Sequence, residues 1–348
     1  MCSSLMRSLA LPGAVPRLLL KRYSVLATTS RRGRCSPLSS TIETPWMFVR
    51  PLVAPLWGNA YVLLFLTMTF WAGNAVAAKL GQADITPVTL TFLRWVGACL
   101  ICYAVAHKRI HADWAEIRAH WLPLTLLGTI GFCGFNAVYY WALTYTTAIN
   151  AAIIQAIMPV LIIAMNLVFF GMRARWLQVV GVVISIVGVA FIVARGDMGV
   201  LLALDFNQGD MLVLVAMLMY GGYAVGLRKK PPLHWVTLLF GLSFVALLMA
   251  VVLFMGELLL GAPRMPGPDG WLVVAYVSIF PSLLAQMFFI RSIELIGANR
   301  AGAYVNLTPI LGSLMAIAFL GEVLHWFHVL AITLVFAGIG LAEKFRAT

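Results

Sequence analysis

The chain has 348 residues, of which 62% are hydrophobic and only 10% are charged. Soluble proteins carry about 25% charged residues, so this composition excludes a soluble protein, and most of the chain is expected to lie in lipid. The formal net charge of +12 would suggest nucleic-acid binding in a soluble protein, but here the loop positions of the basic residues explain it better.

Residues 1–46 differ from the rest of the chain because they are rich in arginine and serine and contain one acidic residue, Glu43. Three interpretations are open: a disordered basic tail in the cytoplasm, an organelle transit peptide, or an extension upstream of a true start at Met47. We favour a tail or a start at Met47 over a transit peptide. None of the three requires a folded structure.

Ten apolar runs follow, each close to the ~20 residues that cross the hydrocarbon core of a bilayer. They predict an all-α integral membrane protein with ten transmembrane helices. The expected spans are residues 57–78, 87–107, 122–143, 148–170, 176–195, 210–228, 235–256, 271–291, 299–320 and 323–343.

Lysine and arginine lie mainly in alternate loops, and this bias predicts the orientation of the chain. If the N-terminus is cytoplasmic, the cytoplasmic segments hold Lys108, Arg109, Arg118, Arg173, Arg175, Arg228, Lys229, Lys230, Arg291, Arg300, Lys344 and Arg346. The other side holds only Lys79, Arg195 and Arg264. Both termini are therefore expected in the cytoplasm and the chain in the plasma or inner membrane. An organelle membrane is the alternative if residues 1–46 are a transit peptide.

The second half of the chain repeats the first. Residues 121–192 align with residues 271–342 without a gap at an offset of 150 positions, and the first two spans align at offsets of 149 and 148. Matched pairs include Trp121/Trp271, Pro159/Pro309, Gly171/Gly321, Trp176/Trp326 and Gly188/Gly338. A period this long indicates two domain-sized repeats, at 57–196 and 209–345, of five helices each.

Because five is an odd number, the second repeat is expected to enter the membrane in the opposite orientation to the first. The charges agree with this inversion. Trp141 and Asn150 flank an outer loop, whereas their partners Arg291 and Arg300 flank an inner one. In transporters, an inverted repeat of this kind places the substrate site between the halves, near the membrane centre.

Several of these residues resemble one known superfamily. Trp71, Gly73 and Lys79 end the first span, Arg94 lies in the second, and the second repeat carries Pro309, Gly321-Glu322 and Gly338 in order. In this pattern the chain resembles the drug/metabolite transporter superfamily, and within it the ten-span group with two EamA domains. The resemblance implies a membrane transporter that exports small metabolites or amino acids by alternating access.

Polar side chains within the spans are the candidate substrate-binding residues, because each costs free energy in lipid and should face the interior. They are Trp71, Asn74, Asn136, Tyr139, Tyr140 and Gln155 in the first repeat, and Tyr220, Tyr223, Gln286, Tyr304 and Asn306 in the second. The repeat pairs Trp71 with Tyr220, Asn74 with Tyr223, and Asn136 with Gln286. The alternative for each residue is an interhelical hydrogen bond, worth about 0.6 kcal/mol on average.

Three further residues have two interpretations each. Arg94 lies about two turns from the outer end of its span, so it either snorkels to the membrane interface or faces the cavity and binds a carboxylate. Pro159 and Pro309 break the hydrogen bonding of matched spans. They either open a central cavity and act as hinges, or form static kinks that only shape helix packing.

These features predict a transporter without catalytic residues, metal or cofactor. A site lined by aromatic and amide groups suits a small molecule with an apolar part, such as an amino acid, better than a phosphate ester. The expected partners are this substrate and the lipid bilayer, with no nucleic acid, and a homodimer is left open. One alternative is a multi-span membrane enzyme, which would need a nucleophile–base pair or a metal cluster. Another is a structural or signalling membrane protein without transport activity, which would leave the inverted repeat unexplained.

Overall fold

The computed structural model describes residues 56–81, 85–142, 144–203, 207–261, 263–320 and 323–344. The segment 1–46 and the turn Gly321-Glu322 lie outside these ranges. The described residues form helices without any strand. Nine helices are long and apolar enough to cross a membrane, and Ala60–Asn74 is a shorter apolar helix. The expected all-α, ten-helix membrane fold is therefore confirmed.

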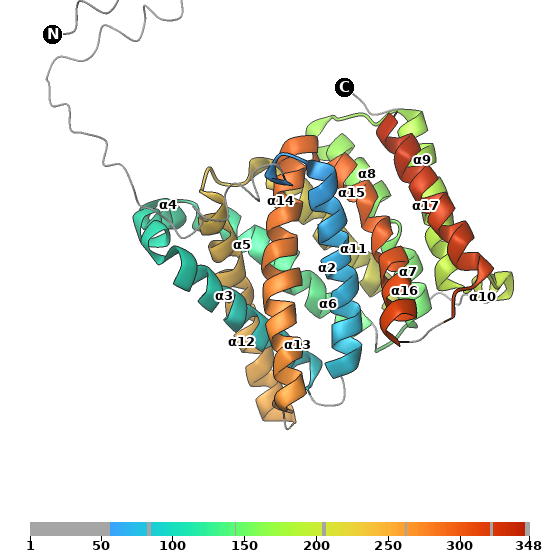
Figure 1. Ribbon diagram of the computed structural model, residues 1–348. Coiled ribbons are helices and arrows are strands. Elements are labelled where there is room, and N and C mark those ends of the chain that lie inside the picture. Colours follow the sequence, from blue (N-terminus) through green and yellow to red (C-terminus); the bar gives the residue numbers. More distant parts are fainter. Residues whose placement is uncertain are drawn as a thin grey trace, which may run out of the picture. The chain divides into compact units, whose positions relative to one another are not determined.

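The first repeat contains α2 (Ala60–Gly81), α3 (Pro87–Ala112), α5 (Trp121–Gly128) with η2 (Thr129–Gly134) and α6 (Phe135–Ala142), α7 (Ala148–Gln155) with α8 (Met158–Phe170), and α9 (Trp176–Val193). The second repeat contains α11 (Gln208–Gly226) with η3 (Leu227–Lys229), α12 (Trp235–Leu260), α13 (Pro268–Ile279) with η4 (Phe280–Leu284) and α14 (Ala285–Ile296), α15 (Ala298–Ala303) with η5 (Tyr304–Asn306) and α16 (Leu307–Leu320), and α17 (Trp326–Lys344). Two short helices, α4 (Trp114–Ala119) and α10 (Met198–Leu202), lie between spans (Figure 1).

Local sequence explains several helix boundaries. Pro87 and Pro268 lie in the first turns of α3 and α13, where the missing N–H removes no helical hydrogen bond. Asn207 and Asp210 form a reciprocal capping box at the start of α11. The α8 helix ends at Gly171, whose φ of 65° lies in the left-handed region that glycine adopts without strain.

The irregular turns recur at matching places in the two repeats. The third span of each repeat contains a π-helical turn at its middle, η2 in one repeat and η4 in the other. The fourth span of each repeat is also broken, after Gln155 and at η5. Pro159 and Pro309 lie in the first turns of α8 and α16, after these breaks. Each break falls four residues before its proline, at Gln155 and Val305, whose carbonyls the prolines leave without a helical N–H partner, as expected for proline kinks. A role of Pro159 and Pro309 as moving hinges stays a prediction.

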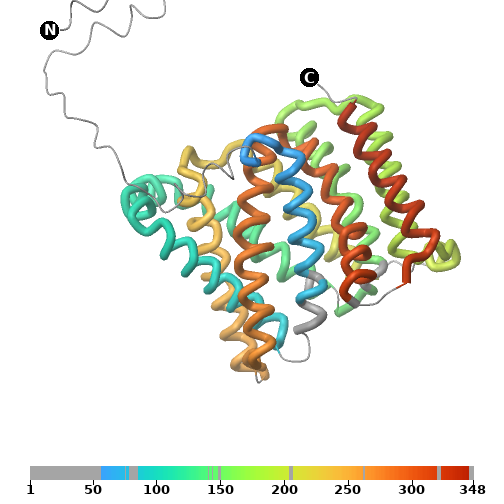
Figure 2. The backbone as a smooth tube through the Cα atoms, viewed as in Figure 1, coloured from blue at the N-terminus to red at the C-terminus, as the bar shows by residue number. Residues whose placement is uncertain are grey.

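Two equivalent helix groups make up the centre of the bundle. In the α2 group, α2 packs against α13, α14 and α16; in the α11 group, α11 packs against α6, α7 and α8 (Figure 1). The remaining helices form two flanking pairs, α3 with α12 and α9 with α17 (Figure 2). The α9 and α17 helices approach closely at Gly181 and Gly338, because neither residue has a side chain. A Cβ added at Gly181 would lie only 2.5 Å from the Gly338 carbonyl oxygen.

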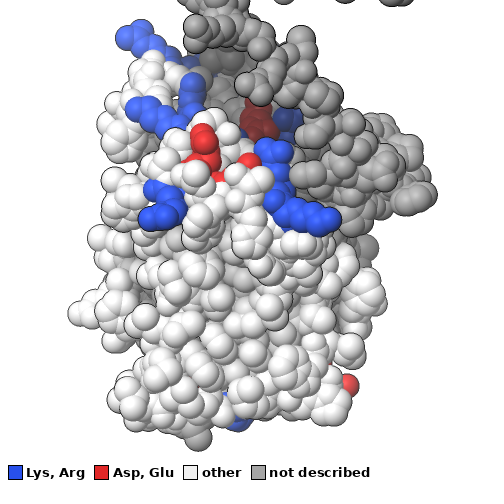
Figure 3. Space-filling view, turned by 90° about the vertical axis from the view of Figure 1, so that its left-hand side faces the viewer, with Lys and Arg blue, Asp and Glu red and all other residues white. Residues whose placement is uncertain are grey.

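The two ends of the bundle differ in charge. The basic end holds the starts of α2 and α15 and the ends of α11, α14 and α17, with Lys230, Arg291 and Arg300 among its residues. The opposite end holds the starts of α3, α7 and α11. Figure 3 shows one face of the molecule, on which charged side chains gather at one end above a wide band of uncharged residues. Such a band suits contact with lipid.

Candidate functional site

A cavity of about 280 Å³ lies between the α2 group and the α11 group, near the middle of the bundle. This volume is close to the lower end of the range for small-molecule sites, about 300–1,000 Å³. The lining residues are Trp71, Asn74, Arg94, Phe135, Asn136, Tyr139, Gln155, Met158, Met217, Tyr220, Pro281, Gln286, Val305 and Thr308. Eight of the residues proposed from the sequence are in this wall.

The cavity lies on the axis that relates the two repeats. Four pairs of lining residues are equivalent under the repeat, so each position contributes twice to the same wall. The pairs are Trp71/Tyr220, Asn136/Gln286, Gln155/Val305 and Met158/Thr308. The Trp71 and Tyr220 rings meet across the axis in a T-shaped contact, with centroids 5.7 Å apart.

The remaining polar lining residues lie nearer the opposite end than the basic end. Tyr139 is within one turn of the end of α6, and Asn74 and Arg94 are about two turns from the opposite-end termini of α2 and α3. On the basic side, Phe289 packs against Trp71 at 5.2 Å and against Tyr220 at 5.9 Å between ring centroids. These three rings form the floor of the cavity.

Arg94 is the one charged residue among those that line the cavity. Its side chain is only 8% exposed, which places it in the bundle rather than at the membrane interface. The Arg94 Nε donates a hydrogen bond to Ser282 Oγ at 2.9 Å, and the guanidinium lies over the Trp95 ring at 5.3 Å. Of the two interpretations of Arg94, the structure therefore favours the cavity over snorkelling.

Three buried hydrogen-bonding atoms in and below the cavity wall form no hydrogen bond of good geometry within the described residues. They are the hydroxyls of Tyr220 and Tyr223 and the Oε1 atom of Gln286. The Tyr220 and Gln286 side chains lie within reach of each other, whereas Tyr223 has no such side-chain interaction. An unsatisfied buried polar group costs about 1–3 kcal/mol, so the Tyr223 hydroxyl is the clearest case of this cost.

Four proposed residues are not in the wall. Tyr223 is 0% exposed and lies under the floor, against Phe132 at 5.7 Å between ring centroids. Tyr304 lies near Tyr61 at the basic end, with ring centroids 6.1 Å apart. Asn306 donates a hydrogen bond to Ser185 Oγ at 2.8 Å, the interhelical alternative considered for it. The side chain of Tyr140 lies outside the described part of the structure.

Several lining residues were missed from the sequence because their side chains are apolar or common in membranes. Phe135, Pro281, Val305 and Thr308 carry no polar signal that stands out in a span. The repeat itself contains the missing information for two of them. Val305 is the partner of Gln155, and Thr308 is the partner of Met158, a residue one position before Pro159.

The two helix groups contact each other in the basic half of the bundle. Lys230 after η3 forms an ion pair with Glu294 of α14 at 3.0 Å, and Asn166 of α8 donates a hydrogen bond to Asn299 of α15 at 2.6 Å. The packing here is tight, because a Cβ on Gly302 would lie 2.6 Å from Ile162 Cδ1. These contacts close the cavity on the basic side.

The equivalent contacts at the opposite end are not formed in the described part of the chain. Gly312 is the repeat partner of Ile162, yet a Cβ on Gly312 would meet no heavy atom within 4 Å. Asn166 and Asn299 are replaced by Ala316 and Ile149, which cannot form the same side-chain hydrogen bond. The interface between the groups is therefore closed on the basic side and open space remains on the other.

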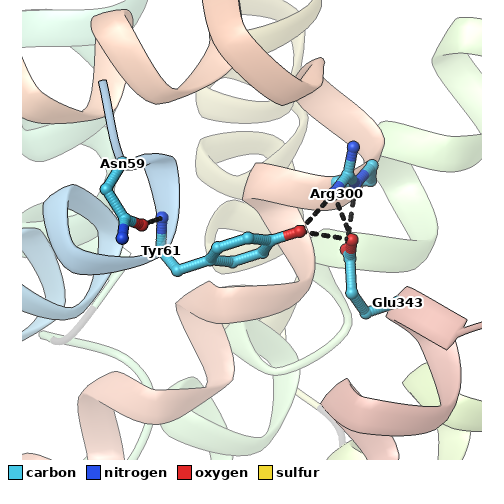
Figure 4. A network of polar contacts seen from close by, with 4 residues as sticks. All are labelled: Asn59, Tyr61, Arg300 and Glu343. Atoms are coloured by element: carbon cyan, nitrogen blue, oxygen red, sulfur yellow. Dashed lines mark hydrogen bonds and ion pairs between the residues drawn. The ribbon is translucent and has the colours of Figure 1, made fainter. Parts of the chain in front are cut away.

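A second set of polar contacts joins α2 to α15 and to the flanking helix α17 at one end, and α7 to α11 at the other. At the basic end, the Tyr61 hydroxyl donates to Glu343 at 2.7 Å and accepts from Arg300 at 2.6 Å, and Arg300 also pairs with Glu343 (Figure 4). At the opposite end, Asn150 donates to Asp210 at 3.2 Å. Asn150 and Asp210 are the repeat partners of Arg300 and Tyr61, so both networks join equivalent helices.

The chain matches a known family over most of its length. The EamA-like transporter family model matches twice, at residues 58–194 and 207–342. An uncharacterized transporter of Bacillus subtilis, YyaM, is 25% identical over 81% of this chain and 92% of its own length. An uncharacterized transporter of Archaeoglobus fulgidus is 27% identical over 81% of this chain and 96% of its own length.

Two further similarities concern the membrane and the fold. The uncharacterized inner membrane transporter YedA of Escherichia coli K12 is 22% identical over 81% of this chain and 89% of its own length. A solved crystal structure superposes with a TM-score of 0.68 at 19% identity, and the match covers 82% of this chain and 97% of that one. At this identity the structural match shows a shared fold.

Proposed function

Because this chain belongs to the EamA-like transporter family and is a multi-pass membrane transporter, we propose that the central cavity is its substrate site and that it works by alternating access. The observation that carries the proposal is the position of the cavity. It lies between two equivalent helix groups, on the repeat axis, and eight of its lining residues form four pairs of repeat partners. Inverted-repeat transporters place their sites there.

In this mechanism the α2 group and the α11 group rock against each other as rigid bodies. The hydrogen bonds of Arg300 to Tyr61 and of Asn150 to Asp210 support this division, because each joins two spans of one group. Glu343 of α17 binds both Tyr61 and Arg300, so this end of α17 would move with the α2 group. The contacts that must break are those between the groups, Lys230 with Glu294 and Asn166 with Asn299. Closing the space around Gly312 would seal the other side.

The proposed substrate is a small organic molecule with an apolar part, hydrogen-bonding groups and one acidic group. Arg94 would bind the acidic group, and aromatic residues such as Trp71 and Tyr220 would pack against the apolar part. Tyr220 and Gln286 would hydrogen bond to the polar part. A multiply charged phosphate ester fits poorly, because Arg94 alone would face several negative charges.

The proposed orientation places the basic end in the cytoplasm, with both termini there, because lysine and arginine are concentrated in cytoplasmic loops of membrane proteins. The cavity of this structure would then face the outside. Export is the proposed direction of net flux. The proposed location is a cell membrane, and an organelle membrane is the alternative if residues 1–46 are a transit peptide. A reporter fused to either terminus should be accessible only from the cytoplasm, which would test the orientation.

The site is tested with the protein in proteoliposomes and a panel of labelled amino acids, monocarboxylates and neutral analogues. Flux is measured in both directions. Asn136→Cys and Gln286→Cys should react with a water-soluble thiol reagent, and a transported substrate should protect both. Asn306→Cys is the matched control, since Asn306 is an amide outside the cavity wall. Transport without any reaction at residues 136 and 286 would refute the site.

A further inference from the structure

Five lining residues have repeat partners that are fully buried and outside the cavity wall in this structure. Asn74, Arg94, Phe135, Tyr139 and Met217 line the cavity, whereas their partners Tyr223, Leu242, Ala285, Phe289 and Met68 are all 0% exposed. The first set lies toward the opposite end and the second toward the basic end. The repeat therefore contains both halves of a pathway, with one half open and the other closed.

The Tyr223 hydroxyl is a second and independent sign. It is fully buried in an apolar setting and has no hydrogen-bond partner within the described residues. Its ring is held tightly, because a Cβ on Gly131 would lie 2.2 Å from it. In this conformation the Tyr223 hydroxyl forms no hydrogen bond, so a phenylalanine at this position would make the same ring contacts. The presence of the hydroxyl is explained if another conformation exposes it to water or substrate, as its partner Asn74 is exposed here.

We propose that Tyr223, Leu242, Ala285 and Phe289 form the wall of a second cavity, which opens toward the basic end when the present cavity closes. This inference rests on the proposed alternating-access function. The floor formed by Trp71, Tyr220 and Phe289 would then open between Tyr220 and Phe289, which belong to different helix groups. The residues on the repeat axis would remain in contact with the substrate in both conformations.

The two cavities differ in chemistry. Leu242 stands where Arg94 stands in the other half, Phe289 replaces Tyr139, and Ala285 replaces Phe135. A carboxylate that reaches Arg94 from the opposite end therefore meets no equivalent cation in the second cavity. A carboxylate substrate should bind more tightly from the opposite end than from the basic end. For net export of such a substrate, release at the opposite end would be the slow step.

Ala285 offers the mildest probe, because alanine to cysteine adds a single sulfur atom at a buried position. In a background with all native cysteines replaced, Ala285→Cys, Phe135→Cys and the control Ala246→Cys are treated with a membrane-impermeant maleimide from each side. Ala246 and its repeat partner Ala98 are both 0% exposed, so the Ala246→Cys variant should stay inert in both conformations.

The expected result is reaction of the Ala285→Cys variant from the basic-end side at least tenfold faster than the control, and reaction of the Phe135→Cys variant from the opposite side only. Each variant is first required to transport in proteoliposomes, so that loss of the fold is not mistaken for a closed cavity. Tyr223→Phe adds a second measurement, in which half-saturation for a transported substrate should rise from the basic-end side only.

Three results would overturn the proposal, and they have separate meanings. If the Ala285→Cys variant transports but reacts no faster than Ala246→Cys, the pathway does not pass Ala285 and the second cavity is refuted while the transporter function stands. If the unmodified protein neither transports nor binds any member of the panel, the proposed function itself fails. An equal effect of Tyr223→Phe from both sides would also contradict the inference.

Discussion

The basic and opposite halves of the central interface are built from equivalent helices, yet only one is closed. In the basic half, Asn166 meets Asn299 and Gly302 packs tightly on Ile162. In the opposite half, the partner of Ile162 is Gly312, which faces open space. An inverted repeat therefore does not require the two ends to be alike at one moment. Under the proposed alternating access, each end would have a closed and an open arrangement.

The comparison also shows which differences lie in the sequence and which in the conformation. Helix breaks and π-helical turns recur at matching positions, so the backbone of each repeat is alike. The polar contacts between the groups do not recur, because the opposite end lacks their residue types. Closure of the basic end is therefore favoured by specific side chains, and changing them should shift the balance between the two conformations.

The largest effect is expected from Arg94→Leu, which makes this position identical to its partner Leu242. Removing a hydrogen bond to a charged group costs about 1.5–3 kcal/mol, or about 10- to 150-fold in affinity for a carboxylate substrate. Arg94→Lys retains the charge and should lose less. Binding assays with a carboxylate and its neutral amide check this, since an equal loss for both ligands would indicate a structural role for Arg94.

Gly302→Ala should have the next largest effect, because its Cβ would lie 2.6 Å from Ile162 Cδ1. Crowding a packed contact costs about 1–3 kcal/mol, and rotation of the Ile162 side chain places this change at the lower end. The basic end should open about fivefold more often, seen as faster labelling at residue 285 in the Ala285→Cys variant. Gly312→Ala is the control and should not speed that labelling, as its Cβ meets nothing in this conformation.

Much of this architecture could be predicted from the sequence. The apolar runs predicted the ten spans, and the alignment at an offset of 150 residues predicted the repeat, because both patterns can be read from the residue types alone. The polar pairs Trp71/Tyr220 and Asn136/Gln286 lie in the wall of one cavity, and the Trp71 and Tyr220 rings contact each other. Their role as substrate-binding residues stays a prediction. The π-helical turns were not predicted, as a turn with one extra residue leaves no periodic signal over so short a length.

The sequence could not show which half of the pathway is open. Nothing in the sequence distinguishes Asn74 from its repeat partner Tyr223 as a site residue, yet Asn74 lines the cavity and Tyr223 is buried. Their difference depends on the conformation of the whole bundle. Asn306 shows a second limit, because a polar residue that forms a hydrogen bond with Ser185 looks the same in the sequence as one that faces a cavity.

Asn299→Ala should open the basic end to a smaller extent. It removes one hydrogen bond between the groups, but the Asn166 side-chain amide keeps its bond to the Ile162 carbonyl at 3.1 Å. The expected loss is about 1 kcal/mol, or about a fivefold shift at most. Labelling at residue 285 in the Ala285→Cys background measures the shift. No change in labelling would show that this hydrogen bond does not contribute to closure of the interface.

The smallest effect is expected from Glu294→Gln, because its pair with Lys230 is partly exposed and such pairs are worth about 0–1 kcal/mol. Labelling at residue 285 should rise less than about fivefold, and high salt should reduce the difference from the parent protein. Asp113→Asn is the matched control, since its pair with Arg109 and its hydrogen bond from Thr237 lie within the flanking α3–α12 pair and do not join the two helix groups. An equal response to both changes would mean that general charge at the basic end, rather than the contact between the groups, sets the conformational balance.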